Sequence, residues 1–155
     1  MEKWIFSLKL RNSAGVLSSL TALFADRGVS IESLTAHGGG PAGTSGTATL
    51  TFAASEARKS HLARLLGRLE SVLALAEFRY DDAAHARKST LARVPLAPGT
   101  LKTQVPSGVL CDVVSSDETS TLALLLGPPA VLDALLAQWS GGTAPEEQDA
   151  TVFVV

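Results

Sequence analysis

The stretch of sequence that decides the fold is residues 10–35, LRNSAGVLSSLTALFADRGVSIESLT. Within it, hydrophobic residues recur at helical spacing and make one apolar face, formed by Leu17, Leu20, Leu23 and Phe24. Glycine then follows at position 28, where it readily adopts the left-handed conformation that ends a helix. The stretch therefore predicts the end of a strand, a short loop, an amphipathic helix and the start of a second strand.

The short loop before this helix consists of Asn12, Ser13, Ala14 and Gly15. Asn12 or Ser13 can cap the helix by accepting a hydrogen bond from a backbone N–H group. The other free N–H groups of the first turn can hold an anion such as a carboxylate. Gly15 has two explanations, both open here: a small residue lets a ligand or a partner backbone come close, or the glycine only eases a tight loop.

The rest of the first half alternates between strands and helices. A second helix opens at Ser55 and carries a leucine stripe, namely Leu62, Leu65, Leu66 and Leu69. Strands are expected over residues 3–11, 29–36, 47–53 and 72–80. The resulting order, βαββαβ, is the ferredoxin-like pattern of the α+β class.

The second half predicts a degenerate copy of the same pattern. Residues 81–88 are polar and alanine-rich and indicate a linker, and the second unit then covers residues 89–155. Its strands are expected near residues 89–97, 109–115, 120–126 and 149–155, with a helix that begins at Pro128-Pro129.

This second unit is expected to lack its first helix. Residues 98–108 hold two prolines and two glycines and can form at most a turn or so. One face of the small sheet would then have no cover of its own. Leu91, Leu122 and Leu124 are the candidates to line that face.

Composition narrows the classes of protein and partner. The chain has 155 residues, is 46% hydrophobic and carries a formal net charge of −2. Few aromatic residues and no basic stripe in the sequence speak against a nucleic acid partner. The first residues do not resemble a signal peptide, and no apolar run approaches the roughly 20 residues of a membrane helix. We therefore expect a cytoplasmic protein with no membrane partner.

Motifs of catalytic or metal chemistry are sparse. Cys111 is the single cysteine and is expected in the core. His85 lies near Asp81 and Asp82, but their spacing is not that of a metal site. The glycine-rich loop 38–46 lacks the framing residues of a phosphate-binding motif. Since no nucleophile, base and orienting group can be assembled, we expect no catalytic residue, no metal and no cofactor.

The run from Asn12 to Thr35 resembles an ACT domain, and most closely that of the small regulatory subunit of acetolactate synthase (acetohydroxyacid synthase). The second half resembles that family more weakly, over Val113–Trp139. The resemblance implies an ACT domain over residues 1–80 and a degenerate ACT-like domain over residues 89–155. The shared residues are Asn12, Gly15, Leu17-Ser18, Leu23-Phe24, Arg27-Gly28 and Ile31-Glu32-Ser33-Leu34-Thr35.

The resemblance implies a non-catalytic subunit for allosteric regulation in branched-chain amino acid biosynthesis. Such a subunit forms a homodimer through its ACT domains, binds a small amino acid such as valine between them, and modulates the thiamine-diphosphate-dependent catalytic large subunit. At position 30 the family typically carries asparagine, whereas this chain has serine. The implied effector-binding residues are Asn12, Ser13, Ala14, Gly15, Val16, Ser30 and Ile31.

Two alternatives to this function stay open. The chain could be a stand-alone ACT-like protein that binds another small molecule, or an enzyme that reuses the fold, because a fold does not fix a function.

Overall fold

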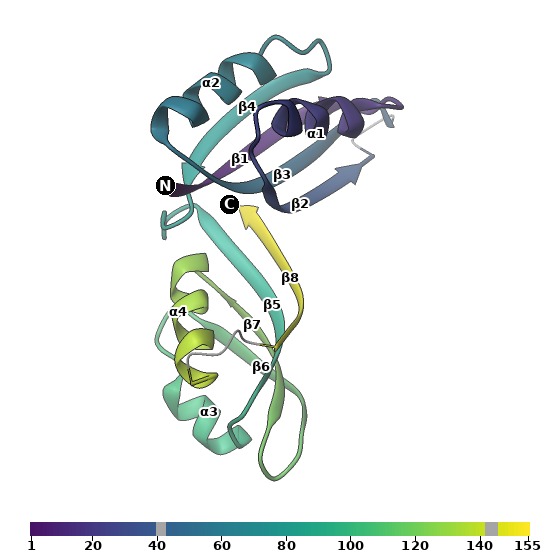
Figure 1. The fold of residues 1–155 in the computed structure, drawn as a ribbon. Helices are drawn as coiled ribbons and strands as arrows, with labels where there is room; N and C mark the ends of the chain where they lie inside the picture. Colours follow the sequence, from purple (N-terminus) through teal and green to yellow (C-terminus); the bar gives the residue numbers. More distant parts are fainter. Residues whose placement is uncertain (40–42, 142–145) are drawn as a thin grey trace. The chain divides into compact units, whose positions relative to one another are not determined.

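A computed structural model describes residues 1–39, 43–141 and 146–155. The chain divides into two compact units, one made mainly of Met1–Tyr80 and the other mainly of Asp81–Phe153 (Figure 1). Each unit contains a four-stranded sheet. In the described part of the chain, no helix is both long and apolar enough to cross a membrane.

The first unit follows the expected order βαββαβ, which confirms the ferredoxin-like prediction. The spatial order β2-β3-β1-β4 makes β2 and β4 the two edges of its sheet, and both helices lie on one face (Figure 1). The strands are β1 (Glu2–Arg11), β2 (Ile31–Gly38), β3 (Ser45–Ala54) and β4 (Val72–Arg79), and the helices are α1 (Val16–Asp26) and α2 (Glu56–Leu66).

Three phenylalanines join the helices to the sheet in the first unit. Phe6 of β1, Phe24 of α1 and Phe52 of β3 are fully buried, with ring centroids 4.7 to 6.4 Å apart in edge-to-face contacts. The helical spacing wrongly assigns Leu17 to this core, since its side chain is 42% exposed. Val16 takes the buried position of the first turn instead, four residues before Leu20.

The second unit has the sheet order β6-β7-β5-β8. Its first strand begins three residues before residue 89, where the second unit was expected to start, so Ala86 already lies in the sheet. The elements are β5 (Ala86–Val94), α3 (Pro98–Gln104), β6 (Leu110–Ser116), β7 (Thr121–Gly127), α4 (Pro129–Trp139) and β8 (Glu146–Val154).

The short helix α3 corrects the expectation that this unit lacks its first helix. It has seven residues and begins with Pro98, where the missing N–H removes no helical hydrogen bond. The buried Leu101 anchors α3 in the core, and Trp139 Nε1 donates a hydrogen bond to Gln104 Oε1 at 2.9 Å. The first helix of the second unit is therefore shortened but present.

Leu91, Leu122 and Leu124 lie on the face of the second sheet that the helices do not cover. Leu91 pairs with Leu124, which is 43% exposed, and Ala92 pairs with Ala123 on the opposite, buried face. Both α3 and α4 pack on that buried face. The open face is thus the one that a ferredoxin-like sheet leaves without helices, and a missing helix is not its cause.

Candidate functional site

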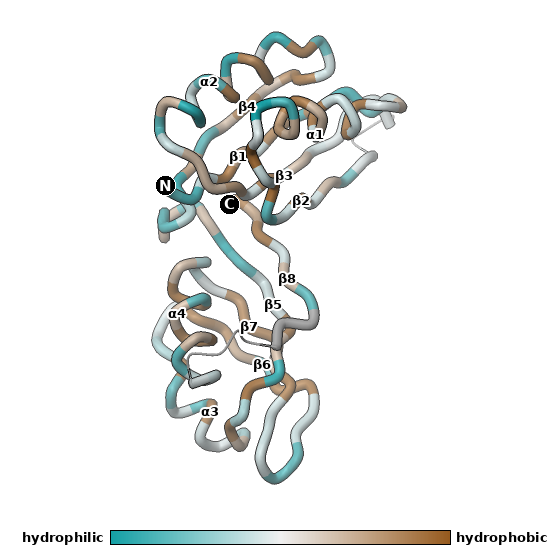
Figure 2. Tube along the Cα trace, viewed as in Figure 1, coloured by the Kyte–Doolittle hydropathy of each residue, from teal (hydrophilic) through white to brown (hydrophobic). Residues whose placement is uncertain are grey.

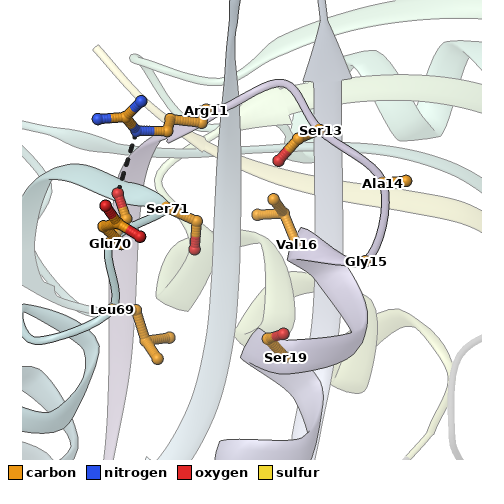
Figure 3. Close-up of a pocket in the computed structure, with 9 residues that line it drawn as sticks. All are labelled: Arg11, Ser13, Ala14, Gly15, Val16, Ser19, Leu69, Glu70 and Ser71. Atoms are coloured by element: carbon orange, nitrogen blue, oxygen red, sulfur yellow. Dashed lines mark hydrogen bonds between the residues drawn. The ribbon is translucent and has the colours of Figure 1, made fainter.

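The loop between β1 and α1 borders a cavity of about 410 Å³ at the N-terminal end of the helix (Figure 3). A smaller cavity of about 210 Å³ lies between the same loop and the end of β2, which contributes Ala36, His37 and Gly38. The larger cavity is lined by Arg11, Ser13, Ala14, Gly15, Val16, Ser19, Leu69, Glu70 and Ser71.

Gly15 is required by the backbone of this loop. Its φ is +84°, and a Cβ added to it would have no heavy atom within 4 Å. A side chain there would therefore meet conformational strain but no clash within the chain. This geometry favours the explanation that the glycine eases a tight turn.

The first turn of α1 is not capped by a side chain, so the expected capping by Asn12 or Ser13 is wrong. Instead, the carbonyl oxygen of Ser13 accepts a long hydrogen bond of 3.4 Å from the amide of Val16. Within the described residues, the amides of Leu17 and Ser18 have no acceptor. Two N–H groups at the positive end of the helix dipole thus stay available for an anion.

Asn12 connects the loop to the hairpin between β2 and β3. Its Nδ2 donates to the carbonyl oxygen of Gly43 at 2.9 Å, and its backbone amide donates to Thr44 at 3.0 Å. Its side-chain oxygen lies 3.4 Å from where Gly38 would carry a Cβ, so the glycine leaves room for this amide. The side chain that was expected to cap the helix is therefore occupied in holding the glycine-rich loop, whose residues 40–42 lie outside the described part.

Arg11 forms the polar rim of the larger cavity. Its backbone amide donates to Ser71 at 2.8 Å, and its Nε donates to the carbonyl oxygen of Glu70 at 3.2 Å (Figure 3). The guanidinium and the hydroxyls of Ser13, Ser19 and Ser71 are donors for a carboxylate. The residues from 69 to 71 are distant in sequence, and only the pairing of β4 with β1 brings them to this loop.

Ser30 and Ile31 do not lie with the other expected effector residues. They line a separate cavity beside Gly28 and Val29, at the C-terminal end of α1. The helix between Gly15 and Ser30 has eleven residues, which corresponds to about 16 Å. One chain therefore does not bring Ser30 and the loop of residues 12–16 to a common ligand.

The two edges of the first sheet differ in chemistry. At the β4 edge, Glu77 and Arg79 point to the helix face in register with Phe6 and Trp4. The buried Lys59 of α2 reaches this edge, with its ammonium 2.7 Å from Glu77 and 4.7 Å above the Trp4 ring. Hydrogen bonds that Lys59 donates to Glu56 and Glu77 raise the pKa of its ammonium.

On the helix face of the sheet, the β2 edge carries apolar side chains, whereas the β4 edge carries charged ones. Ile31 and Leu34 pair with the buried Phe52 and Leu50 of β3, and Leu34 remains 37% exposed. Charged side chains that point inward at an edge oppose pairing with another strand, whereas an apolar edge permits it. A further strand can therefore pair with β2 and extend the first sheet.

His85 and Cys111, which were considered for metal or thiol chemistry, make contacts that are typical of structural residues. In the described ranges, no group of three His, Cys, Asp or Glu side chains is placed to hold a metal. The Nδ1 of His85 lies 3.0 Å from a carboxylate oxygen of Asp82, and this hydrogen bond lowers the pKa of Asp82. Cys111 packs partly buried against the second core, and burial raises the pKa of its thiol.

Comparison with known proteins agrees with this architecture. Residues 6–74 match the family described as AHAS small subunit-like ACT domain. No curated protein sequence matches the chain. The crystal structure of the acetolactate synthase small subunit from Thermotoga maritima is similar with a TM-score of 0.70 at 14% identity, and the match covers 100% of this chain and 96% of that one.

A second solved structure shares the general fold. The regulatory subunit of aspartate kinase from Thermus thermophilus, in its ligand-free form, is similar with a TM-score of 0.50 at 14% identity, over 92% of this chain and 93% of that one. At these identities the likeness describes the fold of both units. Residues 6–74 are thus similar in sequence to the AHAS small subunit-like ACT domain, and the fold of the chain agrees with that similarity.

Proposed function

We propose that the chain is a non-catalytic regulatory subunit that binds a small amino acid beside its β1–α1 loop and modulates an acetolactate synthase. The observation that carries the proposal is the uncapped start of α1, where the amides of Leu17 and Ser18 are available in an ACT domain of this family. Helix-start amides hold a carboxylate, which every amino acid carries.

The effector site is completed by a second copy of the chain. Antiparallel pairing of two β2 strands across a two-fold axis places the start of one strand opposite the end of the other. The end of β2 borders the 210 Å³ cavity beside Asn12, and its start follows Ser30. Ser30 of the partner subunit and Ile31 of the partner subunit then close that cavity, which joins residues that one chain keeps apart.

Each part of a zwitterionic amino acid has a matching group in this arrangement. The amides at the start of α1 receive the carboxylate, and the side-chain oxygen of Asn12 with the hydroxyl of Ser30 receives the ammonium. Leu17 and Ala36 border the same cavity and suit an aliphatic side chain such as that of valine.

Regulation follows from building one site out of two chains. An effector that binds only the paired arrangement stabilises that arrangement against others. If the catalytic large subunit binds one of these arrangements more tightly, the effector changes the affinity for the large subunit. The large subunit then changes the affinity for the effector by the same factor.

Calorimetry with valine and matched variants tests the placement of the site. Ser30→Asn, which restores the residue typical of the family, should strengthen valine binding, and Ser30→Ala should weaken it. Ser19→Leu, at a residue that lines the larger cavity but not the 210 Å³ cavity, should leave the affinity unchanged. If Ser19→Leu abolishes binding while both Ser30 variants bind like the wild type, the two-chain site is wrong.

The regulatory role has its own test. The purified acetolactate synthase large subunit should gain activity when this chain is added, and valine should reverse part of that gain. An unchanged rate with and without the chain would favour the alternative of a stand-alone binding protein.

A further inference from the structure

A basic surface is formed by α2 and the turn that follows it. Arg58, His61 and Arg64 occupy exposed positions three residues apart on the helix, and the exposed Arg68 follows it. Figure 2 shows the hydrophilic residues of α2 alternating with its buried leucines. These basic side chains gather on the exposed side of α2 and the following turn, in a chain of net charge −2.

The arginines of this surface have no counterion among the residues that the structure describes. Within the described ranges, Arg58, Arg64 and Arg68 form no ion pair or hydrogen bond through their side chains, and neither does Arg27 at the end of α1. In the same unit, Lys59 contacts Glu56 and Glu77, and Lys3 contacts Glu32 at 2.8 Å. The unpaired guanidinium groups are therefore available to bind anionic groups of a partner.

An apolar groove lies next to these arginines. It is a cavity of about 340 Å³ between α1 and α2, and its hydrophobic part is formed by Ala22, Leu23, Leu65 and Leu69. Arg27 and Arg68 border it, together with the carboxylate of Asp26 and the hydroxyl of Ser19. The groove shares no residue with the 210 Å³ cavity where we place the effector.

We infer that this groove, with Arg27 and Arg68 at its border and Arg58 and Arg64 along the exposed side of α2, is a docking surface for an acidic amphipathic helix of a partner protein. The apolar groove takes aliphatic side chains at helical spacing, and the arginines take the flanking carboxylates, with which they form paired hydrogen bonds. Asp26 disfavours a carboxylate at its own end of the groove and so helps to fix the orientation of the partner.

The combination of groove and charge distinguishes this partner from a nucleic acid. A phosphate backbone uses the arginines but has no aliphatic groups for Leu65 and Leu69. The groove also has no aromatic side chain on which bases stack. A protein segment with leucines and glutamates uses both parts of the surface.

The test uses the full-length chain and three labelled probes measured by fluorescence anisotropy. The first probe is a helical peptide with leucines on one face and glutamates on its flanks. The second is a scrambled peptide of the same composition, and the third is a DNA duplex. We expect the amphipathic peptide to bind more tightly than the scrambled one by about tenfold or more, and the duplex to bind most weakly.

Two pairs of variants connect binding to the groove. Ala22→Glu places a carboxylate in the groove at an exposed position, and Ala57→Glu adds the same charge to α2 outside it. The first should weaken peptide binding by about tenfold, and the second should weaken it by less than about threefold. The double substitution Arg64→Gln and Arg68→Gln should weaken it as Ala22→Glu does, whereas Lys102→Gln in the second unit should not.

The inference is overturned by any of three results: equal binding of the amphipathic and scrambled peptides, tighter binding of the duplex, or equal effects of Ala22→Glu and Ala57→Glu. Circular dichroism of each variant shows whether weaker binding comes from a change in the docking surface or from loss of the fold. Because valine binding is measured separately and at another cavity, failure of this inference leaves the proposed effector site standing.

Discussion

The side-chain amide of Asn12 donates a hydrogen bond from Nδ2 to the carbonyl oxygen of Gly43, at 2.9 Å and across 31 residues of chain. This contact fixes the loop before α1 against the hairpin between β2 and β3. The loop carries the available amides of the helix start, and the hairpin ends the strand that pairs with a second copy in our proposal. Asn12 therefore connects the effector site with the edge of the sheet.

Replacing Asn12 by alanine should loosen this connection. The variant loses the hydrogen bond to Gly43, and the neighbouring bonds from the Asn12 amide to Thr44 and from the Gly39 amide to Ser45 lose support. We expect faster hydrogen exchange at these two amides, and valine binding weaker by about tenfold, as for a lost hydrogen bond to a charged group. Unchanged exchange at both amides would show that the hairpin holds the loop without Asn12.

Replacing Gly15 by alanine should destabilise the first unit by about 1 kcal/mol, because its φ of +84° lies where a side chain is strained. Gly99 is a matched control, since it lies in α3 and its φ is not positive. Gly99→Ala should leave stability unchanged or slightly higher. Urea unfolding measures both, and equal stability of the two variants would contradict the argument.

Replacing Leu34 by glutamate should convert a dimer into a monomer. The side chain is 37% exposed on the β2 edge, and a charge there opposes pairing with a second β2 strand. Leu73→Glu is the control, because Leu73 is similarly exposed, at 48%, on the β4 edge. Light scattering should show a dimer for the control and a monomer for Leu34→Glu. The reverse result would move the interface to β4.

Replacing Lys59 by methionine should destabilise the first unit by about 1–3 kcal/mol. The variant loses the ammonium above the Trp4 ring and the hydrogen bonds to Glu56 and Glu77. Lys9→Met, at an exposed position of β1, should change stability by less than about 0.5 kcal/mol. Chemical denaturation at neutral pH measures the free energy of unfolding of both variants. Equal values would show that the contacts of Lys59 do not stabilise the first unit.

Asp117 should make the second unit sensitive to acid. Hydrogen bonds from the amide of Thr119 and from the hydroxyl and amide of Ser120 hold the pKa of its carboxyl well below the usual value. A lowered folded pKa stabilises the protein above the unfolded value of about 3.9, and this contribution is lost as the pH falls toward the folded value.

Thermal unfolding as a function of pH tests this role. The melting temperature of Asp117→Ala should lie below that of the wild type above about pH 5, and the gap should narrow below about pH 4. Glu118→Ala removes the next carboxylate, for which no hydrogen bond is found among the described residues, and should leave the wild-type profile unchanged. A gap that stays constant with pH would contradict the argument.

The sequence by itself determined the order of elements in the first unit and its resemblance to the AHAS small subunit-like ACT domain. Helical periodicity placed Leu20 and Phe24 in the core, and Gly28 adopts the left-handed conformation expected after α1, with φ at +62°. These features depend on neighbours within a few residues, which is why a linear pattern reveals them. The short α3 escaped the pattern because Pro98 stands at the one helical position that tolerates proline.

The tertiary structure decided which residues meet. Ser30 lies at the far end of α1 from Gly15, which no periodicity reveals, and the site that we propose therefore joins them through a second chain. The pairing of β1 with β4 brings Ser71 to Arg11, and the packing of α1 against α2 forms the groove beside Arg68. Such contacts join residues far apart in sequence, and only the buried core and the sheet register fix their positions.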